Sequence, residues 1–303
     1  MREPTAAAVA QGSVWVTGQT CSQAQRRGRY VPASMAHPAK MLPSIARHAI
    51  ATYTKPGELV LDPMAGIGTT VVEAVHLDRH GYGIEYEPRW AELAAANIRH
   101  ATRQGATGTG VVWRADARRL PNPLPAAMRG RVALVLTSPP YGPSTHGHVR
   151  EWAGRDGEVS RINTRYGRDT RNLAYRSPDE LAAGFTQILT GCAAVLRPGG
   201  HVVVTARPYR RHGELVDIPG MVAAAGGPAG LVLVDRCAAL IAGVRRGHLV
   251  PRGSFFQLRN LRAAQAAGDP QWLINHEDVL IFSRAGDQRP RGRDLPPATA
   301  AQR

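Results

Sequence analysis

Short apolar runs alternate with Ala-rich amphipathic stretches along most of the chain. The apolar runs predict buried strands at 58–62, 81–85, 111–114, 131–137, 201–206, 231–241 and 279–282. Helical patterns lie between several of these runs, at 69–77, 89–101 and 181–196. Because strand and helix alternate at this spacing, the sequence predicts an α/β fold with a mostly parallel sheet and helices on both faces.

Some segments depart from this alternation. Residues 1–34, rich in Ala, Gly, Ser, Thr and Gln, predict a flexible N-terminal leader, and 284–303 predicts a disordered tail. The remaining domain, 35–283, carries two basic insertions at 142–178 and 236–276. Insertions at strand ends are where folds of this class carry function.

Composition narrows the class of partner. The 303 residues are 43% hydrophobic, which is enough for a sizeable core, and 38 basic against 23 acidic residues give a net charge of +15. This excess predicts a polyanionic partner, nucleic acid before a membrane surface. Three widely spaced cysteines disfavour disulfides and structural zinc. Without a signal pattern or an apolar run of about 20 residues, a cytoplasmic protein is expected, with no membrane span.

A glycine-rich loop follows the first predicted strand and opens a helix, in the sequence Asp62-Pro63-Met-Ala65-Gly66-Ile-Gly68-Thr69. Glycines let such a loop turn tightly and approach a ligand. Glu85 ends the next strand, where it can accept hydrogen bonds from a ribose diol, and Asp116 follows the third, in reach of an adenine amine. The loop has no P-loop lysine, and Val71 replaces the third glycine of the dinucleotide fingerprint. S-adenosylmethionine, whose ammonium Asp62 can meet, is therefore the favoured ligand.

A second motif, Thr137-Ser138-Pro139-Pro140-Tyr141, follows a strongly apolar strand. Two prolines fix the backbone and remove two N–H groups, so the preceding carbonyls stay free to accept hydrogen bonds. Ser138 and the Pro139 carbonyl are expected to accept both protons of an exocyclic amine, which favours a tetrahedral nitrogen with an available lone pair. Tyr141 can stack on the base. Because the amine is inaccessible in a duplex, a flipped base is the expected substrate form.

Together the two motifs resemble those of the DNA amino-methyltransferases of the cytosine-N4 and adenine-N6 group. His37-Pro-Ala-Lys40 also resembles their segment preceding the glycine loop. The resemblance implies a class I, Rossmann-like methyltransferase sheet of seven strands, the last antiparallel. It implies cofactor contacts by His37, Lys40, Asp62, Pro63, Ala65, Gly66, Gly68, Thr69, Glu85, Asp116 and Thr137. It implies that Ser138, Pro139, Pro140 and Tyr141 are the catalytic segment. Unlike many members, this chain has its Pro-Pro-Tyr motif after the glycine loop, and no large separate target-recognition domain fits.

Basic and imidazole side chains supply candidates for nucleic-acid contact. These candidates are His146, His148, Arg207, Arg210, Arg211, Arg245, Arg246 and Arg252. The two histidines have a spacing compatible with metal but lack a third ligand, so no metal is expected.

The sequence thus predicts a site-specific DNA methyltransferase acting on an exocyclic amine. Ser138 favours cytosine-N4 over adenine-N6. Two alternatives stay open, an RNA amine methyltransferase of the tRNA guanosine-N2 type and a non-catalytic nucleic-acid-binding relic. DNA is the expected partner, with RNA as the alternative. A protein partner is also possible in this prediction, either the cognate nuclease of a restriction–modification pair or a specificity partner.

Overall fold

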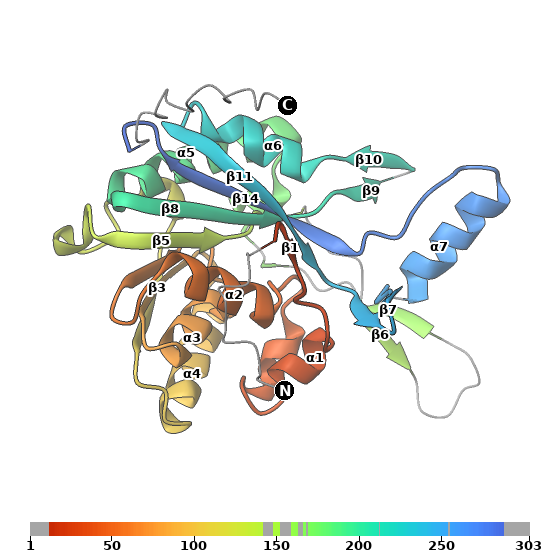
Figure 1. Ribbon diagram of the computed structural model, residues 1–303, viewed down its shortest axis with the longest axis horizontal. Helices are drawn as coiled ribbons and strands as arrows, with labels where there is room; N and C mark the ends of the chain where they lie inside the picture. Colours follow the sequence, from red (N-terminus) through yellow and green to blue (C-terminus); the bar gives the residue numbers. More distant parts are fainter. Residues whose placement is uncertain are drawn as a thin grey trace, which may run out of the picture.

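An eight-stranded sheet forms the centre of the computed structural model, which describes residues 12–141, 148–151, 159–162, 166–167, 169–211, 213–253 and 255–287. The sheet contains β1 (Val14–Trp15), β2 (Leu59–Asp62), β3 (His80–Glu85), β4 (Thr109–Arg114), β5 (Val132–Thr137), β8 (Leu196–Ala206), β11 (Leu231–Leu240) and β14 (His276–Arg284). Its strand order is β1-β11-β14-β8-β5-β2-β3-β4 (Figure 1). Strands β4, β3, β2, β5 and β8 run parallel, and β14 is antiparallel to both its neighbours. The predicted class I methyltransferase fold is confirmed, with β1 as an additional strand.

Helices cover both faces of this sheet (Figure 1). On one face lie α2 (Pro43–Tyr53), α3 (Thr69–His76) and α4 (Pro88–Arg103), and on the other α5 (Pro178–Val195) and α6 (Ile218–Gly226). Large side chains fill the layers between, with Trp90, Phe185 and Phe282 almost fully buried. Helix α5 begins at a capping box in which the Ser177 and Glu180 side chains each accept a hydrogen bond from the other's backbone N–H. These layers hold the sheet rigid, which fixes the positions of the strand ends.

The expected flexible leader is wrong for residues 12–34. Strand β1 pairs in parallel with β11, and Trp15 is buried against the ring of His48, 4.3 Å between centroids. Helix α1 (Ser22–Arg26) and the 3-10 turn Pro32–Ala36 follow. Arg26 is buried and donates to the Met41 carbonyl. Sequence composition missed this packing because the contacts join segments that are distant in the chain. Residues 1–11 lie outside the described part, as do 288–303 of the expected tail.

The Arg29 guanidinium neutralises a buried carboxylate on α3. Glu73 is fully buried and accepts hydrogen bonds from Arg29 Nε and Nη2, at 2.8 and 2.6 Å, and from Tyr30 Oη at 2.8 Å. Removing one partner of a buried pair leaves an uncompensated charge. We expect Arg29→Ala to lower the free energy of unfolding by about 3 kcal/mol in urea denaturation. The control, Arg27→Ala, removes an exposed neighbour and should change it by less than about 0.5 kcal/mol. Equal effects of the two substitutions would contradict this role.

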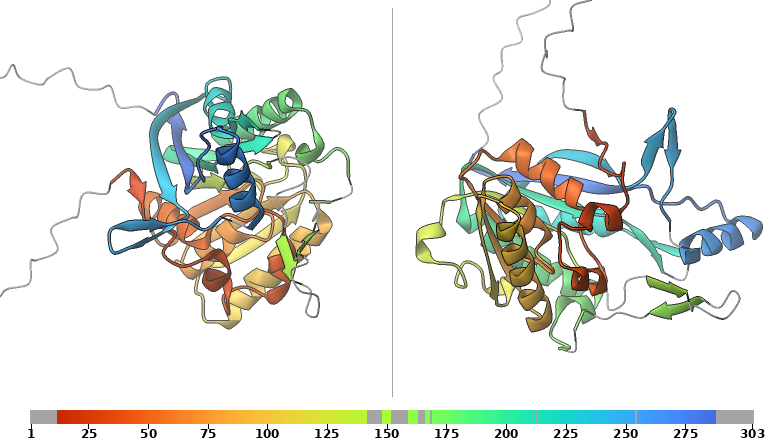
Figure 2. Two further views of the ribbon diagram at one scale, coloured as in Figure 1. Left: turned by 90° about the vertical axis from the view of Figure 1, so that its right-hand side faces the viewer. Right: turned by 90° about the horizontal axis from the view of Figure 1, so that it is seen from below.

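Accessory elements gather at the edge of the sheet where the parallel strands end. They are the hairpins β6–β7 (His148–Glu151, Val159–Ile162), β9–β10 (Tyr209–Arg211, Glu214–Val216) and β12–β13 (Gly243–Arg245, His248–Val250), and helix α7 (Phe255–Ala266). Figures 1 and 2 show them projecting on the same side of the domain. The expected insertion at 236–276 is corrected in one respect, since 236–240 belong to β11 in the sheet. Both basic insertions therefore contribute elements near one edge.

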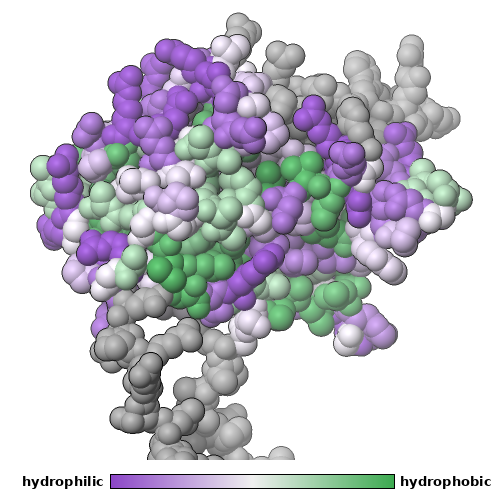
Figure 3. Space-filling model, turned by 90° about the horizontal axis from the view of Figure 1, so that it is seen from above, coloured by the Kyte–Doolittle hydropathy of each residue, from purple (hydrophilic) through white to green (hydrophobic). Residues whose placement is uncertain are grey.

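Within the described residues, no helix has the length and hydropathy needed to cross a membrane. On the face drawn in Figure 3, hydrophilic side chains surround smaller groups of hydrophobic ones.

Candidate functional site

A cavity of about 1070 Å³ opens at the carboxyl ends of β2, β3, β4, β5 and β8. In open parallel sheets, ligands bind in this crevice outside the strand ends. Most of the residues predicted for the site line it together: His37, Lys40, Asp62, Pro63, Ala65, Gly66, Thr69, Glu85, Asp116, Ser138, Pro139, Pro140, Tyr141, Arg207, Arg210, Arg211 and Arg252. The two sequence motifs thus face a single space.

The glycine loop is held in place by the neighbouring strand. Gly66 adopts a left-handed φ of 53°, and its N–H donates to Glu85 Oε2 at 2.7 Å. A Cβ on Gly66 would lie 3.1 Å from His37 Nε2. Glycine at this position therefore satisfies both the turn and the close packing of the imidazole ring.

Two of the residues predicted to contact the cofactor, Gly68 and Thr137, do not line the cavity. Gly68 has a φ of 79°, and a Cβ there would come within 3.1 Å of the Ala94 Cβ, so it lets α3 approach α4. Thr137 is fully buried and donates from Oγ1 to Asp62 Oδ1 at 2.8 Å. Both residues thereby shape the site through their neighbours.

Two buried carboxylates line the cavity without a compensating cation. Asp62 and Glu85 are 4% and 8% exposed, and neither has an ion-pair partner among the described residues. Burial raises the pKa of Asp62 to about 6, against hydrogen bonds from Thr70, Met64 and Thr137. Burial likewise raises the pKa of Glu85 to about 7. Such carboxylates suit a ligand that brings hydrogen-bond donors and a positive charge into the cavity.

Lys40 and His37 form a further part of the wall, with His37 packed beside the glycine loop. Burial, assisted by Arg26, lowers the pKa of Lys40 to about 8, and its ammonium donates to the carbonyls of Met35 and His37. Burial lowers the pKa of His37 to about 3, so its imidazole is neutral at physiological pH. The His37 ring packs edge-on against Trp90 at 4.5 Å and Tyr166 at 5.7 Å. This wall thus presents one cation and a neutral aromatic ring.

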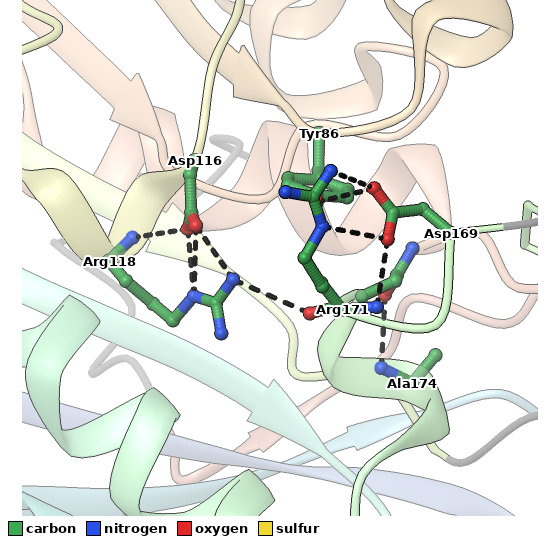
Figure 4. A network of polar contacts seen from close by, with 7 residues as sticks. Tyr86, Asp116, Arg118, Asp169, Arg171 and Ala174 are labelled. Carbon is green, nitrogen blue, oxygen red and sulfur yellow. Dashed lines mark hydrogen bonds and ion pairs between the residues drawn. The ribbon is translucent and has the colours of Figure 1, made fainter.

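Asp116 is already engaged by an arginine. Arg118 donates to it from its backbone N–H and its guanidinium, at 2.7 to 3.1 Å, and these bonds lower the pKa of Asp116 although burial opposes them. Figure 4 shows a neighbouring cluster in which Asp169 accepts from Tyr86 Oη and from Arg171. Arg118 also reaches the Arg171 carbonyl at 3.4 Å. Asp116 is therefore one member of a longer polar network.

The second motif ends a strand that is buried along its whole length. Strand β5 delivers Ser138 and the two prolines to the cavity, beside the end of β2. The Tyr141 hydroxyl is hydrogen-bonded by the Arg207 backbone and lies within electrostatic range of Glu277. Burial, followed by the effect of Glu277, raises the pKa of the Tyr141 phenol well above its ordinary value, so its hydroxyl is neutral. The segment therefore presents acceptors and an aromatic ring, with no added charge.

Only some of the residues predicted to contact nucleic acid line the cavity. Arg207, Arg210 and Arg211 follow β8 and line the cavity, whereas the exposed Arg245 and Arg246, at the turn of β12–β13, do not. Arg252 lines the rim but donates to the carbonyls of Gly18 and Gln19, at 3.0 and 2.9 Å. His146 lies outside the described residues. His148 begins β6, of which only the backbone is described.

Several cavity residues escaped sequence reasoning. They are Tyr86, Arg118, Tyr166, Arg171 and Glu277. Only Glu277 carried a signal, since it lies two residues before the predicted strand at 279–282, close to the edge of the sheet. Among the described residues, no group of three or more His, Cys, Asp or Glu side chains is placed to hold a metal ion.

Comparison with known proteins agrees with this geometry. Residues 3–96 match the family model N6_N4_Mtase, described as DNA methylase, and this stretch includes the glycine loop and Glu85. The chain is 34% identical over 58 residues to the Type II methyltransferase M.BglII of Bacillus subtilis, covering 19% of this chain and 16% of that protein. It is 31% identical over 107 residues to the tRNA (guanine(10)-N2)-dimethyltransferase of Methanothermobacter thermautotrophicus, covering 35% of this chain and 29% of that one. The chain thus spans less than a third of either relative.

The predicted resemblance to the DNA amino-methyltransferases is confirmed. Among solved structures, TrmN from Thermus thermophilus is similar at 19% identity and a TM-score of 0.48, over 86% of this chain and 53% of that chain. The match to a DNA methylase model agrees with S-adenosylmethionine as the cofactor of the site. The residues present fit it, because Asp62 suits its ammonium, Lys40 its carboxylate and Glu85 its ribose hydroxyls.

Cofactor binding is expected to release protons. The cationic ammonium favours ionised carboxylates, so it lowers the pKa of Asp62 and Glu85 from their raised values near 6 and 7. Affinity for S-adenosylmethionine should therefore rise as pH increases through these values and level off above them. Calorimetry in two buffers of different ionisation enthalpy measures the released protons. Glu85→Gln should reduce that number and flatten the profile, and an unchanged profile would contradict the assignment.

Proposed function

We propose that this chain is a methyltransferase that transfers a methyl group from S-adenosylmethionine to the exocyclic amine of a base flipped out of DNA. One observation carries the proposal. The glycine-loop carboxylate and the Ser138 segment open into the same cavity from adjacent strands, and the Asp62–Thr137 hydrogen bond of 2.8 Å joins the two motifs directly. Such a junction fits direct transfer between two bound ligands, with no covalent intermediate on the enzyme.

The chain's own residues orient the amine. When bound, S-adenosylmethionine supplies an electrophilic methyl group. Ser138 and the Pro139 carbonyl accept the two amine protons, which draws the nitrogen lone pair out of conjugation with the ring. Tyr141 stacks on the base and holds it in position. Catalysis then comes from orientation and from acceptors fixed before the substrate arrives.

DNA is favoured as the substrate by the family match and by the charge around the cavity. Arg207, Arg210 and Arg211 lie where a polyanion would approach, and the chain carries a net charge of +15. The serine at position 138 favours cytosine-N4 over adenine-N6, following the resemblance. The similarity to a tRNA guanine-N2 methyltransferase supports RNA as the second candidate substrate.

Tritiated methyl transfer to duplex DNA and to total tRNA, measured side by side, tests the proposal. Nucleoside mass spectrometry then identifies the methylated base. We expect N4-methylcytosine, or N6-methyladenine, from the DNA. Label in the tRNA alone would move the function to RNA. An Asp62→Ala preparation serves as the control for contaminating activity.

A further inference from the structure

Glu277 faces the target side of the cavity from a strand that neither motif contains. It lies near the start of β14, which pairs antiparallel with β8, Asp278 opposite Ala206. The next position along this pairing brings Glu277 beside Arg207, directly after β8. Glu277, Arg207 and Tyr141 all line the cavity. The carboxyl group therefore opens into the same cavity as the aromatic ring on which a base would stack, and lies within electrostatic range of its phenol.

The base presents a second polar atom to this wall. In cytosine and adenine, the ring nitrogen beside the exocyclic amine (N3 and N1, respectively) is a hydrogen-bond acceptor. Ser138 and the Pro139 carbonyl are themselves used as acceptors for the amine, so they cannot satisfy that nitrogen. A buried acceptor without a donor is unfavourable. The site therefore needs a donor beside Tyr141.

We propose that Glu277, as a carboxylic acid, donates a hydrogen bond to the ring nitrogen adjacent to the amine and so selects cytosine or adenine over guanine. This inference rests on the proposed function. Guanine carries an N1–H donor at the corresponding position, so the acid proton would meet another donor. A protonated Glu277 that presents its O–H to the base thus favours cytosine or adenine over guanine.

The surroundings of Glu277 shift its carboxyl group toward the protonated form. Burial raises the pKa of its carboxyl group, while Arg207, the Thr205 hydroxyl and His276 oppose this change. Tyr141 also faces it, as a neutral phenol. A stacked base shields the carboxyl further from water, which raises its pKa in the complex.

Two substitutions in the full chain, each compared with the wild type, distinguish a role of protonated Glu277 as a hydrogen-bond donor from a role of its ionised carboxylate. Glu277→Gln keeps a donor that no longer titrates, and Glu277→Ala removes it. Methyl transfer to the DNA substrate is measured between about pH 5.5 and 8.5. We expect wild-type kcat/KM to fall as pH rises through this range, Glu277→Gln to retain activity with a flatter profile, and Glu277→Ala to lose about 10- to 100-fold. The matched control is Glu214→Gln, an exposed residue of β10, which should leave the profile unchanged.

A base analogue gives a readout independent of turnover. Equilibrium binding of duplex DNA is measured with S-adenosylhomocysteine, using 3-deazacytosine or 1-deazaadenine at the methylated position. The analogue of the true target should weaken binding by the wild type and should cause no further loss in Glu277→Ala.

Each alternative result is distinguishable. A Glu277→Gln variant as impaired as Glu277→Ala, or an equal analogue effect in wild type and Glu277→Ala, overturns the role of Glu277 and leaves DNA methylation standing. Methylation of guanosine in RNA alone overturns the proposed function. If the enzyme methylates guanosine in RNA and Glu277→Gln abolishes this activity, Glu277 is needed as an ionised acceptor, and its proposed role as an acid is overturned as well. Failure of the wild type to methylate either nucleic acid overturns both proposals.

Discussion

Replacing Ser138 with alanine is expected to lower kcat about 100-fold and to leave the Kd for S-adenosylmethionine unchanged. Ser138 follows β5 and lines the cavity with the buried carboxylates of Asp62 and Glu85; in the proposed function Ser138 meets the base and the two carboxylates meet the cofactor. The lost acceptor acts on the amine as its nitrogen becomes tetrahedral, so the loss should appear in the chemical step. Single-turnover methyl transfer measures that step, and calorimetry measures cofactor binding.

The control for Ser138→Ala removes a hydroxyl elsewhere. Thr190 is exposed on α5 and donates only to the Thr186 carbonyl of its own helix, at 3.0 Å. Thr190→Ala should leave both constants unchanged. Near-full turnover by Ser138→Ala would contradict the acceptor role. A parallel loss of cofactor affinity would show that Ser138 acts instead by holding the loop.

The sequence was most informative where function depends on residues close together in the chain. The glycine loop, Glu85 and the Ser138 segment each follow a predicted strand, and parallel strands bring their carboxyl ends to one edge. The structure accordingly brings Asp62 and Ser138 into one cavity. The family resemblance also implied the antiparallel last strand, here β14.

Contacts between distant segments were beyond such reasoning. Arg29 was interpreted as part of a loose basic leader, because nothing local shows that Glu73, 44 positions away, is buried and needs a cation. The pairing of Asp116 with Arg118, and of Tyr86 with Asp169, depends in the same way on how loops meet above the sheet. Net charge alone cannot separate an arginine that is used inside the fold from one that is free to meet a phosphate.

Gly68 illustrates a subtler difference. Its conformation was foreseen, since a tight turn after a strand calls for a positive φ. Its neighbour was not, because the approach of α3 to Ala94 on α4 is set by helix packing. A motif residue can therefore serve the site by holding a helix in place without touching the ligand.

Replacing Asp62 is expected to have the largest effect on the cofactor. Asp62→Ala should raise the Kd for S-adenosylmethionine at least about 30-fold, because truncation of one member of a buried charge pair costs about 2–5 kcal/mol. Asp179→Ala, at an exposed position in the first turn of α5, is the matched control and should leave the Kd unchanged. Calorimetry measures both. An unaltered Kd in Asp62→Ala would contradict the assignment of the ammonium to this carboxylate.

The same carboxylate predicts an opposite effect on the stability of the free protein. Burial raises the pKa of Asp62 to about 6, so above that pH the folded chain holds an unfavourable charge. Its contribution to stability is greatest at low pH and decreases as pH rises through about 6. Asp62→Asn removes the charge and retains an oxygen that can accept from Thr137 and Met64. At a pH of about 8, well above this pKa, its Tm should therefore rise while cofactor affinity falls. A lower Tm together with a lower cofactor affinity would show that Asp62 is required for folding. A higher Tm with a lower cofactor affinity would show that the charge of Asp62 destabilises the free protein and serves ligand binding.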